Sequence, residues 1–207
     1  ITRIYRIWQR DLLVMIVISN EQAVKNETAI MRHLLQYDIL LHIRRPMISS
    51  SAFESLIQAI GIEQLNKLVS HQQHDLAAEM GFTRLHFNSQ NREKGLHVKY
   101  QGTLICSTST HNIAEFNSLD VSWNYAFLSP FYPSISKQGY GEGSTILKEL
   151  PRRTNQTCKL IALGGIHKDN LQQALDAGAD DVAMLGSIWQ AENPVSYLAS
   201  CLSKIEL

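Results

Sequence analysis

The sequence has few cysteines, and no two of them have the close spacing that is typical of metal ligands. Cys106, Cys158 and Cys201 are the three cysteines among 207 residues, and they lie far apart with no C-x-x-C motif. This pattern argues against a disulfide framework and against a cysteine-rich zinc site. We therefore expect a reducing, cytoplasmic setting.

The sequence also lacks an excess of charge of either sign. It has 19 Lys and Arg against 19 Asp and Glu, with a pI near 7.2. Proteins that bind nucleic acids or anionic membranes mainly by electrostatics need a basic surplus, so we expect neither partner. Any phosphate group must then be bound by local contacts.

Long hydrophobic runs are missing as well, because no stretch approaches the roughly 18 to 20 apolar residues of a membrane span. Residues 1–14 carry Arg3, Arg6 and Arg10 ahead of a short apolar run that ends at Ser19. A signal peptide is the weaker alternative, since no small-residue cleavage site follows. We interpret residues 1–14 as an upstream or non-native leader and residues 15–207 as one domain.

From Met15 onward, short apolar runs alternate with stretches of helical periodicity. The apolar runs predict eight strands, at residues 15–19, 39–44, 67–71, 84–88, 103–107, 125–129, 159–163 and 181–185. The periodic stretches predict helices at residues 27–37, 51–61, 73–80, 112–119, 145–152, 169–178 and 194–205. The connection 89–101 is polar and without periodicity, so we expect a loop with little helix there.

Strands that alternate with helices form right-handed βαβ units and a parallel sheet. Eight such units predict an α/β protein with a compact (β/α)8 TIM barrel as its single domain, although about 190 residues is short for that fold. An open doubly wound sheet is the alternative. No Gly-rich dinucleotide-binding motif follows the first strand, so the barrel is favoured.

Glycines follow the last two predicted strands, at the barrel end where ligands bind. Gly164 and Gly165 follow the seventh strand, and Gly186 follows the eighth. Glycines let backbone N–H groups approach an anion closely, and these two loops are the usual phosphate site of the fold. Tight turns would explain either loop alone, whereas the two together predict a phosphate-binding site.

The loop after the sixth predicted strand offers hydroxyl groups and a cation. Ser134, Ser136 and Lys137 can donate hydrogen bonds and charge to one phosphate. A solvated polar loop is an equal alternative for this segment by itself. Combined with the glycine loops, it favours a phosphorylated ligand.

Polar residues end the early strands, namely His42, Arg44, His71, His86, Asn88, Ser109 and His111. Side chains alternate along a strand, so His42 shares a face with Arg44, and His86 shares one with Asn88. We expect these imidazoles to position a ligand beside a guanidinium. A three-histidine metal site is the less favoured alternative, because no carboxylate is placed to orient the rings, and no metal ligand is predicted.

Six stretches, in consistent order and spacing from Met15 onward, resemble the thiamine phosphate synthase/TenI family, whose members are thiamine-phosphate pyrophosphorylase-like. They are LLHIRR (40–45), HDLAAEMGFTRLHFN (74–88), STSTH (107–111), LSPFYPSISKQGY (128–140), ALGGI (162–166) and AGADDVAMLGSIW (177–189). The resemblance implies a compact (β/α)8 barrel. It also implies a transferase of thiamine biosynthesis that joins hydroxymethylpyrimidine diphosphate to thiazole phosphate and releases pyrophosphate.

The resemblance also implies roles for individual residues. Arg44 would face the departing diphosphate, and Lys137 would contact the thiazole phosphate. The expected catalytic residues are Arg44, His86 and Lys137; the expected phosphate-binding residues are Ser134, Ser136, Lys137, Gly164, Gly165 and Gly186; the expected substrate-binding residues are His42, Arg44, His71, Asn88 and Ser109.

The family pattern implies a Mg²⁺ ion, but its carboxylates are replaced here. Gln72 and Asn91 stand where the carboxylates are expected, and Pro46 stands where the pattern has a diphosphate-binding lysine. Neutral amides are poor ligands for Mg²⁺. Arg45 is expected to offset part of the lost positive charge.

Two alternatives to the synthase remain open. A TenI-like thiazole tautomerase would need a base other than Pro130, which stands where that branch has its catalytic histidine; His86, His71 or His42 would have to act instead. A non-catalytic protein that binds thiazole phosphate or thiamine phosphate is the other. An enzyme is the favoured interpretation, with phosphorylated thiazole and pyrimidine molecules as partners, and a homo-oligomer stays open.

Overall fold

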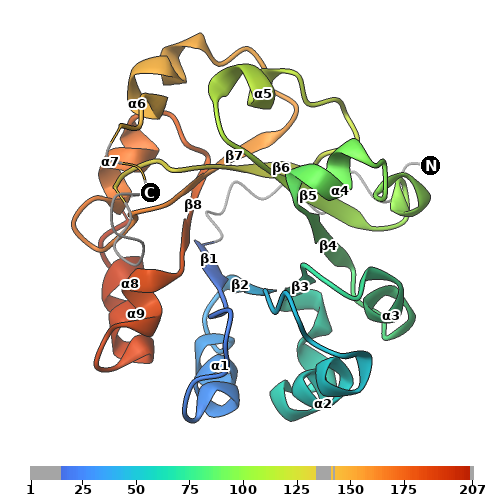
Figure 1. Cartoon of the computed structure of the whole chain (residues 1–207). Coiled ribbons are helices and arrows are strands. Elements are labelled where there is room, and N and C mark those ends of the chain that lie inside the picture. The colour runs from blue at the N-terminus through green and yellow to red at the C-terminus, as the bar shows by residue number, and fades with distance from the viewer. Residues whose placement is uncertain (1–14, 134–140, 142, 206–207) are drawn as a thin grey trace.

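A computed structural model describes residues 15–133, 141 and 143–205 of the chain (Figure 1). Eight parallel strands close into a barrel, with each strand hydrogen-bonded to its neighbours in chain order. They are β1 (Met15–Ile18), β2 (Ile39–Ile43), β3 (Leu68–Ser70), β4 (Arg84–Phe87), β5 (Ile105–Thr110), β6 (Tyr125–Leu128), β7 (Lys159–Leu163) and β8 (Asp181–Met184). The predicted (β/α)8 barrel is confirmed.

Helices surround the barrel as an outer ring (Figure 1). They are α1 (Glu27–Leu34), α2 (Ser50–Ile60), α3 (His74–Glu79), α4 (Ser89–Glu93), α5 (Ile113–Asn117), α6 (Ile146–Glu149), α7 (Leu171–Asp176), α8 (Gly186–Trp189) and α9 (Pro194–Leu202). Three 3₁₀ turns, η1 (Ile62–Lys67), η2 (Val98–Tyr100) and η3 (Leu150–Arg152), complete the connections. Most of these helices are only one or two turns long, which is how so short a chain completes the barrel. In the described part of the chain, no helix combines the length and apolar character needed to cross a membrane.

Two local predictions were wrong. The connection 89–101 contains α4 and η2, because the Asn88 side chain accepts a hydrogen bond from the backbone N–H of Asn91, 2.8 Å away, and caps α4. The fifth strand begins at Ile105 instead of residue 103. The backbone N–H of Leu104 donates to the carbonyl of Tyr100 in a turn, at 3.0 Å, and is not available for strand pairing. At its other end the strand continues to Thr110 instead of residue 107, because residues 108–110 pair with β6.

Side chains alternate between two separate cores. One core fills the barrel interior and consists of Ile16, Ile18, Leu40, Val69, Ile105, Tyr125, Phe127, Ile161 and Ala183. The other lies between the strands and the helices, and residues such as Ala126 and Leu128 of β6 belong to it. On β6, the alternation therefore directs Tyr125 and Phe127 inward. The interior is filled by side chains, so a ligand can enter only at an end of the barrel.

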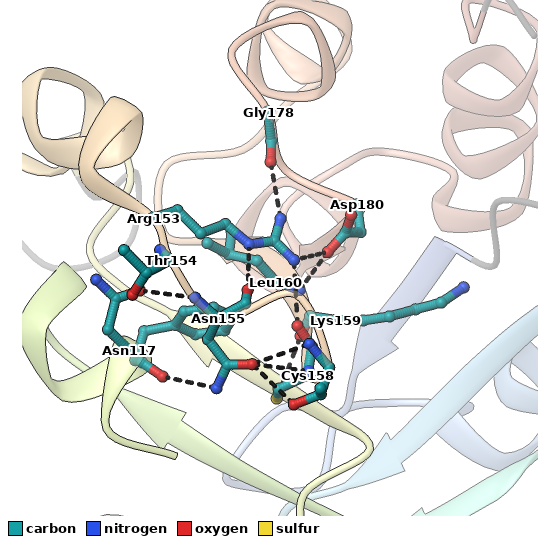
Figure 2. Close-up of polar contacts among 11 residues, drawn as sticks. Asn117, Arg153, Thr154, Asn155, Cys158, Lys159, Leu160, Gly178 and Asp180 are labelled. Carbon is teal, nitrogen blue, oxygen red and sulfur yellow. Dashed lines mark hydrogen bonds and ion pairs between the residues drawn. The ribbon is translucent and has the colours of Figure 1, made fainter. Parts of the chain in front are cut away.

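A polar cluster centred on Arg153 joins segments at the amino-terminal end of β7 and β8 (Figure 2). The guanidinium donates to the carbonyl of Cys158 at 3.1 Å, to the carbonyl of Gly178 at 3.2 Å and to the Asp180 carboxylate at 2.6 Å. The same Asp180 oxygen accepts a hydrogen bond from the backbone N–H of Leu160 at 2.6 Å. Because this end of the fold carries stability and ligands bind at the other, we assign the cluster a structural role.

The Arg153 cluster gives a stability prediction. Replacing Arg153 by alanine removes charge-assisted hydrogen bonds at a largely buried position, and should lower the free energy of unfolding by about 2 to 3 kcal/mol. Arg152 is exposed and supplies a matched control, since Arg152→Ala should change the free energy of unfolding by less than about 0.5 kcal/mol. Urea denaturation measures both values, and equal effects would contradict the assignment.

Candidate active site

A cavity of about 440 Å³ opens at the carboxyl ends of the barrel strands. Residues that follow strands from both halves of the barrel line it. Among the residues predicted from the sequence, those that line the cavity are Arg44, His71, His86, Asn88, Ser109, His111, Gly164, Gly165 and Gly186. The two groups of predicted residues, imidazoles of the early strands and glycines of the late ones, therefore share one space.

His42 lies beneath the cavity and connects its floor to the barrel interior. Its side chain is fully buried on β2 and does not line the cavity. The Tyr125 hydroxyl, from β6, lies 2.9 Å from His42 Nε2, and His42 Nδ1 lies 2.8 Å from His71 Nε2. A hydrogen-bonded chain thus runs from Tyr125 through His42 to His71 at the cavity surface.

His86 is fixed on both sides of its ring. Its Nδ1 lies 3.0 Å from the Ser107 hydroxyl, and its Nε2 lies 3.0 Å from the Ser109 hydroxyl. The His86 ring stacks on that of His71, with centroids 4.1 Å apart and 29° between the planes. Phe127, from β6, packs against His86, with ring centroids 4.9 Å apart. These contacts leave His86 little freedom to reorient.

Burial keeps the three rings neutral. Desolvation is the main cause that lowers the pKa of His42 and His71 well below the usual histidine value, with the neighbouring His86 as the second cause for both. Desolvation also lowers the pKa of His86 to about 3. At neutral pH the rings therefore act as hydrogen-bond donors and acceptors and not as cations.

The two arginines that follow β2 point to different partners. Arg44 lines the cavity and forms an ion pair with Glu21, with about a third of its side chain exposed. Arg45 is buried, forms an ion pair with Glu27, and is absent from the cavity wall. The expectation that Arg45 offsets missing positive charge in the site is therefore wrong, because Glu27 already compensates its charge.

The loop of Gly164 and Gly165 is held close to the loop that follows β6. Gly165 has a φ of +66°, and a Cβ there would lie 2.2 Å from the carbonyl oxygen of Pro133. The Asn170 side chain donates to the Gly165 carbonyl at 2.9 Å and holds the loop in place. The backbone N–H groups of Gly164, Gly165 and Gly186 donate no hydrogen bond to any residue that the structure describes. Backbone N–H groups in turns of this kind can bind an anion.

Three of the predicted phosphate-binding residues, Ser134, Ser136 and Lys137, lie outside the described residues. The sequence analysis missed two interior side chains, Tyr125 and Ser107. The two-residue period could have indicated both, because Ser107 shares a face with Ser109 and Tyr125 shares one with Phe127. Nothing in the sequence indicated that Tyr125 reaches across the barrel to His42.

The described residues do not fit a Mg²⁺ ion. No aspartate or glutamate lies among the described residues that line the cavity. Gln72 lines the cavity, but its Oε1 accepts the backbone N–H of Arg45 at 2.7 Å. Asn91 lies on α4 and is not part of the wall. Since Mg²⁺ prefers carboxylate and other oxygen ligands, the cavity wall offers it no suitable donor set.

The chain is similar in sequence to one family of proteins. The sequence model of that family, described as "Thiamine monophosphate synthase", matches residues 14–188. The thiamine-phosphate synthase of Bacillus velezensis is 34% identical over 96 residues, which are 45% of this chain and 42% of that protein. The thiamine-phosphate synthase of Geobacillus thermodenitrificans is 32% identical over 107 residues, which are 50% of this chain and 48% of that protein. The chain thus spans about half the length of these curated relatives.

Solved structures resemble the whole barrel. The thiamine phosphate pyrophosphorylase of Bacteroides thetaiotaomicron superposes with a TM-score of 0.75 at 21% identity, covering 93% of this chain and 97% of that one. The thiamine phosphate pyrophosphorylase of Pyrococcus furiosus gives a TM-score of 0.75 at 16% identity, covering 93% and 95%. At these identities the similarity supports the fold.

The neutral histidines predict a dependence of stability on pH. The unfolded chain takes up protons on these rings below about pH 6.5, whereas folded His86 does so only near its pKa of about 3. The free energy of unfolding should therefore fall as the pH is lowered from about 6.5 toward 3, by up to ~1.4 kcal/mol per pH unit for each ring.

Urea denaturation with EDTA present measures this dependence. His86→Gln should reduce the slope, whereas His33→Gln, at an exposed position of α1, should leave it unchanged. A free energy of unfolding that does not change across this pH range would show that folding does not lower the pKa of these rings.

Proposed function

The chain belongs to the thiamine monophosphate synthase/TenI family, and from this premise we propose that it joins a hydroxymethylpyrimidine diphosphate to a thiazole phosphate. The products are thiamine phosphate and pyrophosphate. The proposal is based on the cavity, which is lined both by two glycine loops and by polar side chains of the early strands; the N–H groups of these glycines make no hydrogen bond to the described residues. One side offers an anion site, and the other offers groups that can orient an aromatic ring.

The thiazole phosphate would be held by the glycine loops. The N–H groups of Gly164, Gly165 and Gly186 can donate hydrogen bonds to phosphate oxygens. Ser134, Ser136 and Lys137 are proposed to complete this contact from the loop after β6. Anchoring the phosphate there would leave the thiazole ring directed toward the histidines.

The pyrimidine would occupy the opposite part of the cavity. His71, Asn88 and Ser109 offer hydrogen-bond donors and acceptors to the ring nitrogens and amino group of a pyrimidine. Phe127 adds an apolar surface on the same wall. Arg44, also on the wall, is placed to contact a diphosphate.

The transfer itself breaks one bond and forms one. The bond between the pyrimidine methylene carbon and the diphosphate oxygen breaks, and pyrophosphate leaves with the electron pair. The thiazole nitrogen then donates its lone pair to that carbon. Arg44 would stabilise the charge that develops on the departing diphosphate, which is the electrostatic contribution that the reaction needs most.

A family-type synthase would use Mg²⁺ to neutralise the diphosphate, but the described residues do not fit that ion. The proposed transfer therefore relies on side chains and backbone groups of this chain. A thiazole tautomerase is not favoured, because a general base works best with a pKa near the working pH, whereas the pKa of His86 is about 3.

The proposed activity is tested by single-turnover assays with both substrates. Excess protein should convert the pyrimidine diphosphate and thiazole phosphate into thiamine phosphate and one equivalent of pyrophosphate. Parallel reactions contain MgCl₂ or EDTA, and an active synthase of the family serves as the control. If the control forms product and this protein forms none in either condition, the synthase proposal is wrong.

The glycine loop gives a matched pair of variants. Gly165→Ala places a methyl group against the Pro133 carbonyl and should weaken binding of thiazole phosphate at least tenfold, because the loop must shift. Gly102 also has a left-handed φ, +76°, but a methyl group there would meet no atom within 4 Å. Gly102→Ala therefore controls for backbone strain and should leave the affinity unchanged.

Isothermal titration calorimetry with thiazole phosphate measures both variants, after circular dichroism has shown that each is folded. Equal affinities for the two variants would place the phosphate elsewhere.

A further inference from the structure

Three histidines from consecutive βα units meet at the floor of the cavity. His42 comes from β2, His71 directly follows β3, and His86 comes from β4. One ring nitrogen of each can be chosen so that the three atoms lie within 4.8 Å of one another. We propose that these three side chains together bind one divalent first-row transition-metal ion, such as Zn²⁺. The site does not depend on the reaction proposed above.

Two of the three rings, those of His42 and His86, are held in the way that metal-ligating histidines require. Such histidines usually have their second nitrogen hydrogen-bonded, which fixes the tautomer and the ring orientation. Tyr125 holds Nε2 of His42, leaving Nδ1 as the ligand atom next to His71. Ser107 and Ser109 hold the two nitrogens of His86, so a serine orients this ring whichever nitrogen binds the ion.

The donor set selects the class of metal. Imidazole nitrogen suits Zn²⁺, Co²⁺ and Ni²⁺, whereas Mg²⁺ requires oxygen ligands that the described cavity wall does not offer. Three protein nitrogens leave a fourth position open in a tetrahedral site. Because His71 and His86 line the cavity, that position would face it and accept water or an oxygen atom of a ligand.

Nearby charge does not forbid a cation. Arg44 lines the same cavity, but Glu21 is paired with it and offsets its charge. The His42–His71 contact of 2.8 Å is shorter than the separation of two nitrogens on one ion, since each bond would be about 2.0 to 2.1 Å long at a tetrahedral angle. Binding would therefore move these rings apart by a few tenths of an ångström. His71 is only partly buried, which allows that movement.

Cobalt titration of the full-length, metal-free chain tests the site. We expect one Co²⁺ per chain, with the intense visible absorption of four-coordinate Co²⁺, and displacement of the ion by Zn²⁺. His71→Gln removes one ligand at a partly buried position and should abolish this spectrum. His33→Ala, which removes an exposed histidine on α1, should leave it unchanged.

A second variant tests the orienting contact. Tyr125→Phe keeps the ring but removes the hydroxyl bound to His42, and should weaken Co²⁺ binding 10- to 100-fold, the range for outer partners of metal ligands. Circular dichroism checks that each variant is folded. The proposal is overturned if the wild type shows no visible Co²⁺ spectrum, or if the spectrum survives His71→Gln. In either case the histidines form only a hydrogen-bonded network.

Discussion

The hydrogen-bonded chain from Tyr125 through His42 to His71 is the interaction on which the rest of the site depends. A polar side chain directed into a closed barrel must find a partner there, because an unpaired buried group costs about 1 to 3 kcal/mol. Tyr125 and His42 lie on opposite sides of the interior and are hydrogen-bonded to each other. Their hydrogen bond lies in the barrel interior, directly beneath the inner end of the cavity. The stacked ring of His86 is held at the same level by Ser107.

The opposite wall of the cavity follows a different principle. There the backbone of the glycine loops lines the cavity, and glycine is required at positions 164 and 165 because the loop after β6 approaches too closely for a Cβ. We propose that these N–H groups form an anion site together with Lys137, so that the binding of a phosphate does not rely on a side-chain cation alone. A ligand that carries a phosphate at one end and an aromatic ring at the other would match both walls.

The sequence was sufficient to predict the barrel, because apolar runs and helical periodicity alternate eight times and each feature is local. The cavity side chains were also largely predictable, since strand ends meet at one end of such a barrel. The start of β5 was not, because a turn at Tyr100 removes residues 103 and 104 from the sheet. Neither the Tyr125–His42 contact nor the Arg45–Glu27 ion pair was predictable, since each joins residues whose proximity depends on tertiary packing.

If the cavity recognises its ligand through a phosphate bound by the glycine loops, the phosphate should dominate the affinity. Calorimetric titration with thiazole phosphate, and with the same thiazole alcohol without its phosphate, measures its contribution. We expect the phosphate ester to bind at least about 100-fold more tightly, since several charge-assisted hydrogen bonds are lost with the phosphate. Equal affinities for the two compounds would contradict it.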